Sequence, residues 1–197
     1  MIKIGIDVGS TTAKLVAVDE NDNLLFSKYE RHNAKAKETI LSFLKELLSE
    51  IGDKDISVRI TGSIGMGISE KCSLPFVQEV VAAAKAIQKD YSHVTSMIDI
   101  GGEDAKVVFF KDAEATDLRM NGNCAGGTGA FIDQMAIILG VNIDELNQLA
   151  MNATQVYPIA SRCGVFCKTD IQNLIAKNVS RENIAASIFR AVAVQTV

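Results

Sequence analysis

The sequence contains one pattern twice: a strand of alternating apolar residues that ends in aspartate, then a glycine turn, then a second strand. The first copy is residues 2–8, with the letters IKIGIDV, followed by a Gly-Ser-Thr-Thr turn at 9–12. The second copy is residues 94–100, with the letters VTSMIDI, followed by a Gly-Gly turn at 101–102. Alternation with a period of two is typical of a half-buried strand, and a short glycine turn joins antiparallel neighbours. The repeat therefore predicts two similar lobes that meet near His93.

The remaining apolar spacing predicts an α/β fold, in which each lobe is a sheet with helices packed on it. Strands at 13–19 and 24–30 extend the opening hairpin into an antiparallel meander. In residues 36–51 the apolar side chains recur every three or four positions, which is typical of an amphipathic helix. A strand at 56–63 and an alanine-rich helix at 77–90 complete the expected first lobe, residues 1–93. The expected second lobe adds a strand at 105–110 and helices at 128–139, 142–152, 168–177 and 181–197.

Composition limits the classes of function. The 197 residues are 48% hydrophobic, which is enough to bury a substantial core. The net charge is −4 and the 20 Lys and Arg residues are scattered, so we expect no nucleic-acid partner. The first ten residues are charged and interrupted by glycine, so we expect no signal peptide, no membrane partner and a cytoplasmic location. The sequence stops without a helix C-cap signal, and we expect the second lobe, residues 94–197, to be truncated.

Aspartate at the end of a strand, followed by Gly-Ser-Thr, suits a nucleotide phosphate. Glycine lets the backbone approach the phosphate, the N–H and hydroxyl groups of the turn donate to its oxygens, and the carboxylate holds Mg²⁺ directly or through water. A single copy is equally typical of an ordinary hairpin turn. Two copies, with strands ending at Asp7 and Asp99, favour a nucleotide site, because two facing hairpins can clamp a β,γ-phosphate and its metal.

The pair of turns resembles the phosphate-1 and phosphate-2 motifs of the acetate and sugar kinase, heat-shock chaperone and actin superfamily. The resemblance implies an actin-like ATPase fold, with two RNase H-like lobes and ATP or ADP with Mg²⁺ between them. Lys14 is interpreted either as a phosphate contact or as a solvated strand residue, and Glu79 either as the carboxylate that positions the attacking water or as a surface residue. The superfamily's Gly-Gly adenosine motif has no counterpart after residue 129. The implied site residues are Asp7, Gly9, Ser10, Thr11 and Thr12 in the first loop and Asp99, Gly101, Gly102 and Asp104 in the second.

Four cysteines, Cys72, Cys124, Cys163 and Cys167, are too few and too widely spaced for a disulfide scaffold. Cys124 precedes the glycine run 126–129, and Cys163 also stands shortly before an expected helix. A helix N-terminus lowers the pKa of a thiol and favours the thiolate that iron or zinc binds. Two ligands do not complete a four-thiolate site, and a twofold-symmetric dimer is the simplest completion. From the spacing alone, buried structural thiols stay an alternative.

Four longer segments resemble the activator components of 2-hydroxyacyl-CoA dehydratases and benzoyl-CoA reductases, which belong to the BadF/BadG/BcrA/BcrD type of ATPase. The segments are GIDVGSTTAK, IDIGGEDAK, RMNGNCAGGTGAFIDQMA and SRCGVFCKTD. The resemblance implies a homodimer that holds one [4Fe–4S] cluster through Cys124 and Cys163 of each subunit. Cys167 and Cys72 have no required counterpart, and we interpret both as packing thiols, with Cys167 as the competitor for the metal. Gly127, Thr128 and Gly129 are expected to serve helix entry and to approach the nucleotide.

The leading hypothesis is an ATP-driven one-electron donor. Reduced ferredoxin or flavodoxin would load the cluster, and ATP hydrolysis would drive the electron to an iron–sulfur dehydratase or reductase. Two alternatives stay open: a small-molecule kinase of the same superfamily, for a sugar or a carboxylic acid, and a non-catalytic nucleotide-sensing module. A kinase gives no reason for Cys124 and Cys163 to stand at helix starts.

Overall fold

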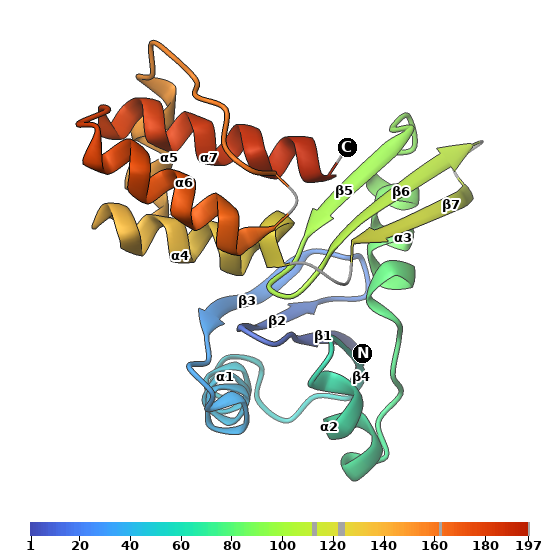
Figure 1. Cartoon of the computed structure of the whole chain (residues 1–197). Coiled ribbons are helices and arrows are strands. Elements are labelled where there is room, and N and C mark those ends of the chain that lie inside the picture. The colour runs from blue at the N-terminus through green and yellow to red at the C-terminus, as the bar shows by residue number, and fades with distance from the viewer. Residues whose placement is uncertain (112–113, 122–124, 162, 197) are drawn as a thin grey trace. The chain divides into compact units, whose positions relative to one another are not determined.

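The computed structural model divides the chain into two compact units, Met1–His93 and Val94–Val197. Figure 1 labels the elements of both. No helix within the described residues is long and apolar enough to cross a membrane. The structure describes residues 1–111, 114–121, 125–161 and 163–196.

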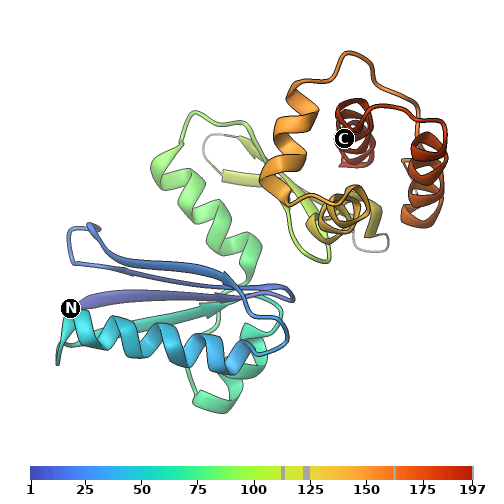
Figure 2. The ribbon, with the colours of Figure 1, turned by 90° about the vertical axis from the view of Figure 1, so that its left-hand side faces the viewer.

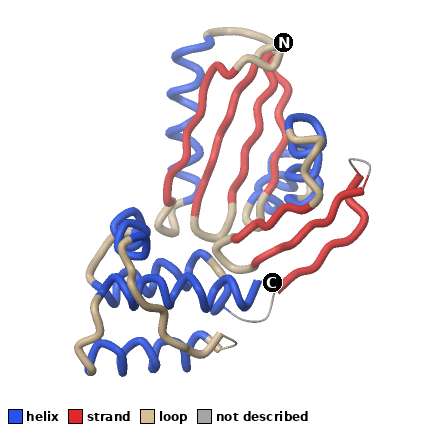
Figure 3. The backbone as a smooth tube through the Cα atoms, turned by 90° about the horizontal axis from the view of Figure 1, so that it is seen from above, coloured by secondary structure: helices blue, strands red, loops and turns tan. Residues whose placement is uncertain are grey.

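A four-stranded sheet with the order β3-β2-β1-β4 forms the first unit (Figure 3). The first three strands run antiparallel, whereas β4 lies parallel to β1. Two helices, α1 and α2, pack on one face of this sheet (Figures 1 and 2). The strands are β1 Ile2–Val8, β2 Thr12–Val18, β3 Leu24–Arg31 and β4 Ile56–Thr61, and the helices are α1 Ala36–Ile51, α2 Gly65–Cys72 and α3 Glu79–Asp90.

Alternation along β1 and spacing along α1 build the core of the first unit. Ile4 and Ile6 of β1 point to the helix-covered face and are buried, while Gly5 between them is exposed. In α1 the buried side chains include Phe43 and Leu47, spaced four residues apart. These side chains pack against the same face of the sheet, so the strand period of two and the helix period of 3.6 converge on one apolar layer.

The second unit combines an antiparallel sheet, with the order β5-β6-β7, and a cluster of helices. α7 contacts α4, α5 and α6, and its buried residues include Ile184 and Ile188. These side chains pack with Met135 of α4 and Ile171 of α6 in a separate apolar core. The elements are β5 Ser96–Ile100, β6 Ala105–Lys111, β7 Glu114–Asn121, the 3₁₀ turn η1 Ala125–Gly127, α4 Gly129–Leu139, α5 Ile143–Met151, α6 Gly164–Ala176 and α7 Arg181–Thr196.

The structure confirms the opening meander and the helix at 36–51, but three predictions from the sequence were wrong or incomplete. Helix α6 begins at Gly164, not at residue 168. Helix α2 was not predicted, because Gly65 and Gly67 in its sequence are poor helix formers. Strand β7 was also missed, because seven of its eight residues are exposed and no apolar alternation marks it.

Two adjacent leucines of α1 test the assignment of its buried face. Leu47 is fully buried and Leu48 is 54% exposed. We expect Leu47→Ala to lower the free energy of unfolding by about 2–5 kcal/mol, because it removes apolar contacts and leaves a cavity. Leu48→Ala should change it by less than about 0.5 kcal/mol. Urea denaturation followed by circular dichroism measures both, and equal losses in the two variants would contradict the assignment.

Candidate functional site

The β1–β2 hairpin carries the first predicted phosphate loop. A hydrogen bond from the Gly9 N–H to the Thr12 carbonyl, at 3.0 Å, closes the turn. Within the described residues, the backbone N–H groups of Ser10 and Thr11 donate to no acceptor, and their hydroxyl oxygens lie 3.5 Å apart. The loop therefore has backbone N–H and hydroxyl groups that can donate hydrogen bonds to the oxygens of an anion.

Asp7 and Lys14 form an ion pair beside this loop. They lie directly opposite each other on β1 and β2, and Asp7 Oδ2 accepts a hydrogen bond from Lys14 Nζ at 2.7 Å. The ring of Tyr29 on β3 lies 5.5 Å from the same ammonium. Burial acts to lower the pKa of Lys14, but the hydrogen bond and charge of Asp7, with smaller effects from Tyr29 and Glu79, raise it above its ordinary value. Lys14 is therefore a charged, paired residue next to the predicted phosphate site.

The other oxygen of the Asp7 carboxylate, Oδ1, is buried and has no hydrogen-bond partner among the described residues. The same is true of the hydroxyl of Thr61, which is the neighbour of Asp7 across the parallel pair of β1 and β4. Gly62 has a φ of 92°. It lies so close to the Asp7 carboxylate that an added Cβ would be 2.6 Å from Asp7 Oδ1. An unpaired buried carboxylate oxygen is costly, and Mg²⁺ prefers oxygen ligands. Asp7 therefore fits the metal that accompanies a nucleotide.

The β5–β6 hairpin repeats this geometry in the second unit. The Gly101 N–H donates to the Asp104 carbonyl at 2.8 Å, and Gly102 follows in the turn. Asp99 lies opposite Lys106, which is the register of the aspartate and lysine in the first hairpin. Lys106 is only 5% exposed, and its ammonium donates to Asp104 Oδ1 at 2.7 Å. The Asp99 carboxylate makes no hydrogen bond or ion pair within the part of the chain that the structure describes, so it is available to a cation.

The N-terminus of α4 lies against this second loop. The N–H of Gly129, the first residue of the helix, donates to the Gly101 carbonyl at 2.8 Å. Thr128 is fully buried, and its hydroxyl oxygen caps the helix by accepting from the Phe131 N–H at 3.3 Å. Gly127, in the turn before the cap, is also buried. The three predicted residues of the glycine run therefore lie at the start of α4 and next to the second predicted phosphate loop.

Two glycines bring together the segments that follow the two predicted cysteine ligands. A Cβ added at Gly164 would lie 3.6 Å from the Cα atom of Gly126. Cys163 is the N-cap residue of α6, and its half-buried thiol is free. Cys124 precedes Gly126 by two positions in the sequence and lies outside the described residues.

The other two cysteines are placed differently. Cys167 is 2% exposed in the core of the second unit, and burial, with a smaller effect of the Asp170 charge, raises its pKa to about 11. It is therefore a thiol at neutral pH, and thiols bind metals poorly. Cys72 is exposed at the end of α2. Over residues 1–111, 114–121, 125–161 and 163–196, no three His, Cys, Asp or Glu side chains are grouped so that they could hold a metal ion.

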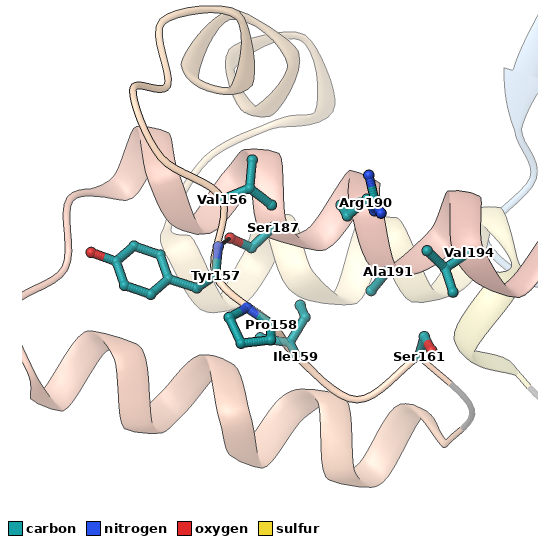
Figure 4. A pocket seen from close by; sticks show the side chains of 9 residues that line it. All are labelled: Val156, Tyr157, Pro158, Ile159, Ser161, Ser187, Arg190, Ala191 and Val194. Atoms are coloured by element: carbon teal, nitrogen blue, oxygen red, sulfur yellow. Dashed lines mark hydrogen bonds between the residues drawn. The ribbon is translucent and has the colours of Figure 1, made fainter.

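Polar side chains hold the extended segment 154–161, which precedes Cys163, the second predicted cysteine ligand. Asn183 Oδ1 accepts from the first two N–H groups of the segment, at 2.9 and 3.0 Å. Ser187 Oγ accepts from the Tyr157 N–H at 2.8 Å, and Figure 4 shows this hydroxyl beside that nitrogen. Asp170 Oδ2 accepts from a further N–H of the segment at 2.9 Å. A cavity of about 420 Å³ borders the segment and α7 (Figure 4).

Three residues at the loops were not predicted from the sequence: Lys106, Gly62 and His32. A signal existed for Lys106, because Lys106 follows Asp99 at the same sequence distance at which Lys14 follows Asp7. Gly62 also carried a signal, because a glycine directly after a strand of a parallel pair often lets another group approach. His32 is 4% exposed and contacts the first loop, but it lies in no motif.

Known proteins are similar to this chain in both sequence and fold. The activator of 2-hydroxyisocaproyl-CoA dehydratase from Clostridioides difficile is 31% identical over 206 residues, which cover 98% of this chain and 73% of the relative. Component A of (R)-2-hydroxyglutaryl-CoA dehydratase from Acidaminococcus fermentans superposes with a TM-score of 0.90 at 28% identity, over 100% of this chain and 76% of that one. The 2-hydroxyisocaproyl-CoA dehydratase activator from Clostridium difficile, solved with ADPNP bound, gives 0.88 at 29% identity, over 100% and 74%.

The likeness to these structures confirms the predicted α/β class and the actin-like ATPase fold. A model of one protein family matches residues 4–197, which is nearly the whole sequence. The chain therefore belongs to the BadF/BadG/BcrA/BcrD ATPase family.

Proposed function

We propose that this chain is an ATP-dependent one-electron donor that activates a 2-hydroxyacyl-CoA dehydratase or a related iron–sulfur enzyme. The contact between Gly126 and Gly164 is the observation that carries the proposal. It joins the segments that follow Cys124 and Cys163, and the nearby Gly129 contacts the second phosphate loop. Nucleotide-binding and cysteine-bearing segments are thus neighbours in one unit.

The relatives support the same assignment. The Acidaminococcus protein is named as a dehydratase activating ATPase, and a further relative is named as a subunit of benzoyl-CoA reductase. A solved activator holds ADPNP, which is an ATP analogue, and this supports ATP and ADP as ligands of the present chain. We expect reduced ferredoxin or flavodoxin to supply the electron.

We assign the phosphate contacts to both hairpin loops. The free N–H groups of Ser10 and Thr11 bind phosphoryl oxygens, while the carboxylates of Asp7 and Asp99 hold Mg²⁺. Glu79, the first residue of α3, is the candidate for positioning the attacking water. Water attacks the γ-phosphorus, the bond from that phosphorus to the β,γ-bridging oxygen breaks, and ADP, phosphate and a proton are released.

We assign Cys124 and Cys163 as ligands of a [4Fe–4S] cluster, which when bound accepts and delivers single electrons. Cys163 is the N-cap residue of α6, and its thiol is free and half-buried. Four thiolates are needed, whereas Cys167 is buried with a raised pKa and Cys72 belongs to the other unit. A second copy of the chain would supply the remaining two ligands, which makes the active form a homodimer.

Backbone contacts connect the second loop with the start of α6, which follows Cys163. The Gly129 N–H is bonded to the Gly101 carbonyl in the second loop, and η1, directly before α4, contacts the start of α6 through Gly126 and Gly164. Interiors packed this closely transmit small displacements, because no free space absorbs them. Hydrolysis that moves the loop would therefore also shift Cys163.

Asp7→Asn tests the assignment of the metal site. We expect kcat for ATP hydrolysis to fall by about 100-fold or more, because the variant loses the charge that holds Mg²⁺. Asp53→Asn, at an exposed position outside the loops, is the matched control and should keep the wild-type rate. Phosphate release under saturating Mg²⁺ and ATP measures both, and a wild-type rate in Asp7→Asn would refute this role.

Cysteine variants test the cluster and the dimer. After anaerobic reconstitution, we expect about four iron atoms per two wild-type chains, and loss of nearly all of them in Cys124→Ala and Cys163→Ala. Cys72→Ala removes an exposed thiol of the first unit and should keep the iron. Iron analysis and the mass of the anaerobic complex measure these outcomes. The assignment fails if Cys163→Ala retains the cluster, or if the wild-type cluster resides in a monomer.

A further inference from the structure

His32 lies directly behind the first phosphate loop and contacts it twice. Its ring nitrogen Nε2 is 3.0 Å from the carbonyl oxygen of Gly9, and its backbone N–H donates to the Thr11 carbonyl at 3.2 Å. The side chain is only 4% exposed. One buried residue therefore binds two carbonyl groups of the same short loop.

The contact with Gly9 fixes the tautomer of the imidazole. A carbonyl oxygen only accepts hydrogen bonds, so Nε2 must carry the proton. The other nitrogen, Nδ1, is buried and has no partner among the described residues. An unpaired polar atom in the interior destabilises the folded state. Among the described residues, the bond to Gly9 is the one side-chain hydrogen bond of His32 that offsets this cost.

The backbone after His32 is also held in an unfavourable conformation. Asn33 and Ala34 have φ values of 47° and 63°, in the left-handed region, which Asn tolerates but Ala rarely adopts. A bond from the Lys35 N–H to the His32 carbonyl, at 2.7 Å, closes this turn. The fold thus maintains a turn with backbone strain at Ala34 directly after His32.

Fixing these two carbonyls orients the donors on the other side of the loop. A trans peptide is planar, so its N–H points opposite to its C=O. The bond to the Gly9 carbonyl therefore directs the Ser10 N–H away from His32, and the bond to the Thr11 carbonyl does the same for the Thr12 N–H. The Ser10 N–H is one of the donors that no acceptor uses within the described residues.

We infer that His32 is a positioning residue, which holds the first loop with its N–H groups turned outward to receive the phosphates. The inference rests on the proposed function, in which this loop binds nucleotide. It adds a residue that contacts neither phosphate nor metal and acts only through the carbonyls of Gly9 and Thr11. The role depends on the reach of one donor, not on the charge of the ring.

Two substitutions of His32 distinguish the hydrogen bond to Gly9 from a role of the side chain in packing alone. Gln places its amide nitrogen at the same number of bonds from Cβ as Nε2 of His, whereas the amide nitrogen of Asn is one bond shorter. We expect His32→Gln to keep the bond to Gly9 and His32→Asn to lose it. In the nucleotide-free full chain, exchange of the Gly9 and residue-32 amides should be about fivefold faster or more in His32→Asn and near wild type in His32→Gln. The amide of Ile4 is the internal control.

Calorimetry with Mg·ADP gives the second measurement. We expect Kd to rise about tenfold in His32→Asn and to stay within about threefold of wild type in His32→Gln. Unchanged loop exchange in His32→Asn overturns the inference, as does a Gln variant that behaves like Asn, or faster exchange with no loss of affinity. If the wild type itself does not bind Mg·ADP but the exchange pattern holds, the proposed function fails while the hold of His32 on the loop stands.

Discussion

Antiparallel pairing of the first two strands in each unit is the constraint on which both proposed phosphate loops depend. In the first hairpin, Ile6 and Val8 are buried on the face that packs against the helices, and this fixes the register of β1. A slip of one residue would move Asp7 into that apolar layer and leave its charge unpaired. Burial of apolar side chains on one face thus places the carboxylate opposite Lys14 on the other.

The two hairpins share a register but distribute their charges differently. Lys14 neutralises the strand-end aspartate of the first hairpin, whereas Lys106 turns to Asp104 in the loop of the second. The Lys106 side chain is 6% exposed, against 43% for Lys14, so it is the more desolvated of the two cations. Asp99 is left without a cationic partner in the described part of the chain. The same sequence pattern therefore yields one carboxylate that is paired through a single oxygen, Asp7, and one without a cationic partner among the described residues, Asp99.

The features predicted from the sequence are those set by local pattern. Apolar alternation predicted β1, and three- and four-residue spacing predicted α1 with its bounds. The start of α6 was misplaced because nothing in the first four helical residues, GVFC, marks a helix, and Val165 and Phe166 there are exposed. The role of His32 could not be predicted either, because its contacts with Gly9 and Thr11 join the end of one strand to the turn between two others.

Packing explains why the run from 126 to 129 is so rich in glycine. A Cβ at Gly126 would lie 2.8 Å from Gln195 Oε1, and one at Gly127 would lie 3.0 Å from Asn121 Nδ2. At Gly129 it would lie 3.2 Å from the Gly101 carbonyl oxygen, whose bond to the Gly129 N–H joins the helix to the second loop. These glycines thus leave room around one turn for Gln195 of α7, Asn121 of β7 and the loop backbone at Gly101. In this fold the glycine-rich segment 126–129 is thus a turn that packs closely against α7, the start of α6 and the loop after β5.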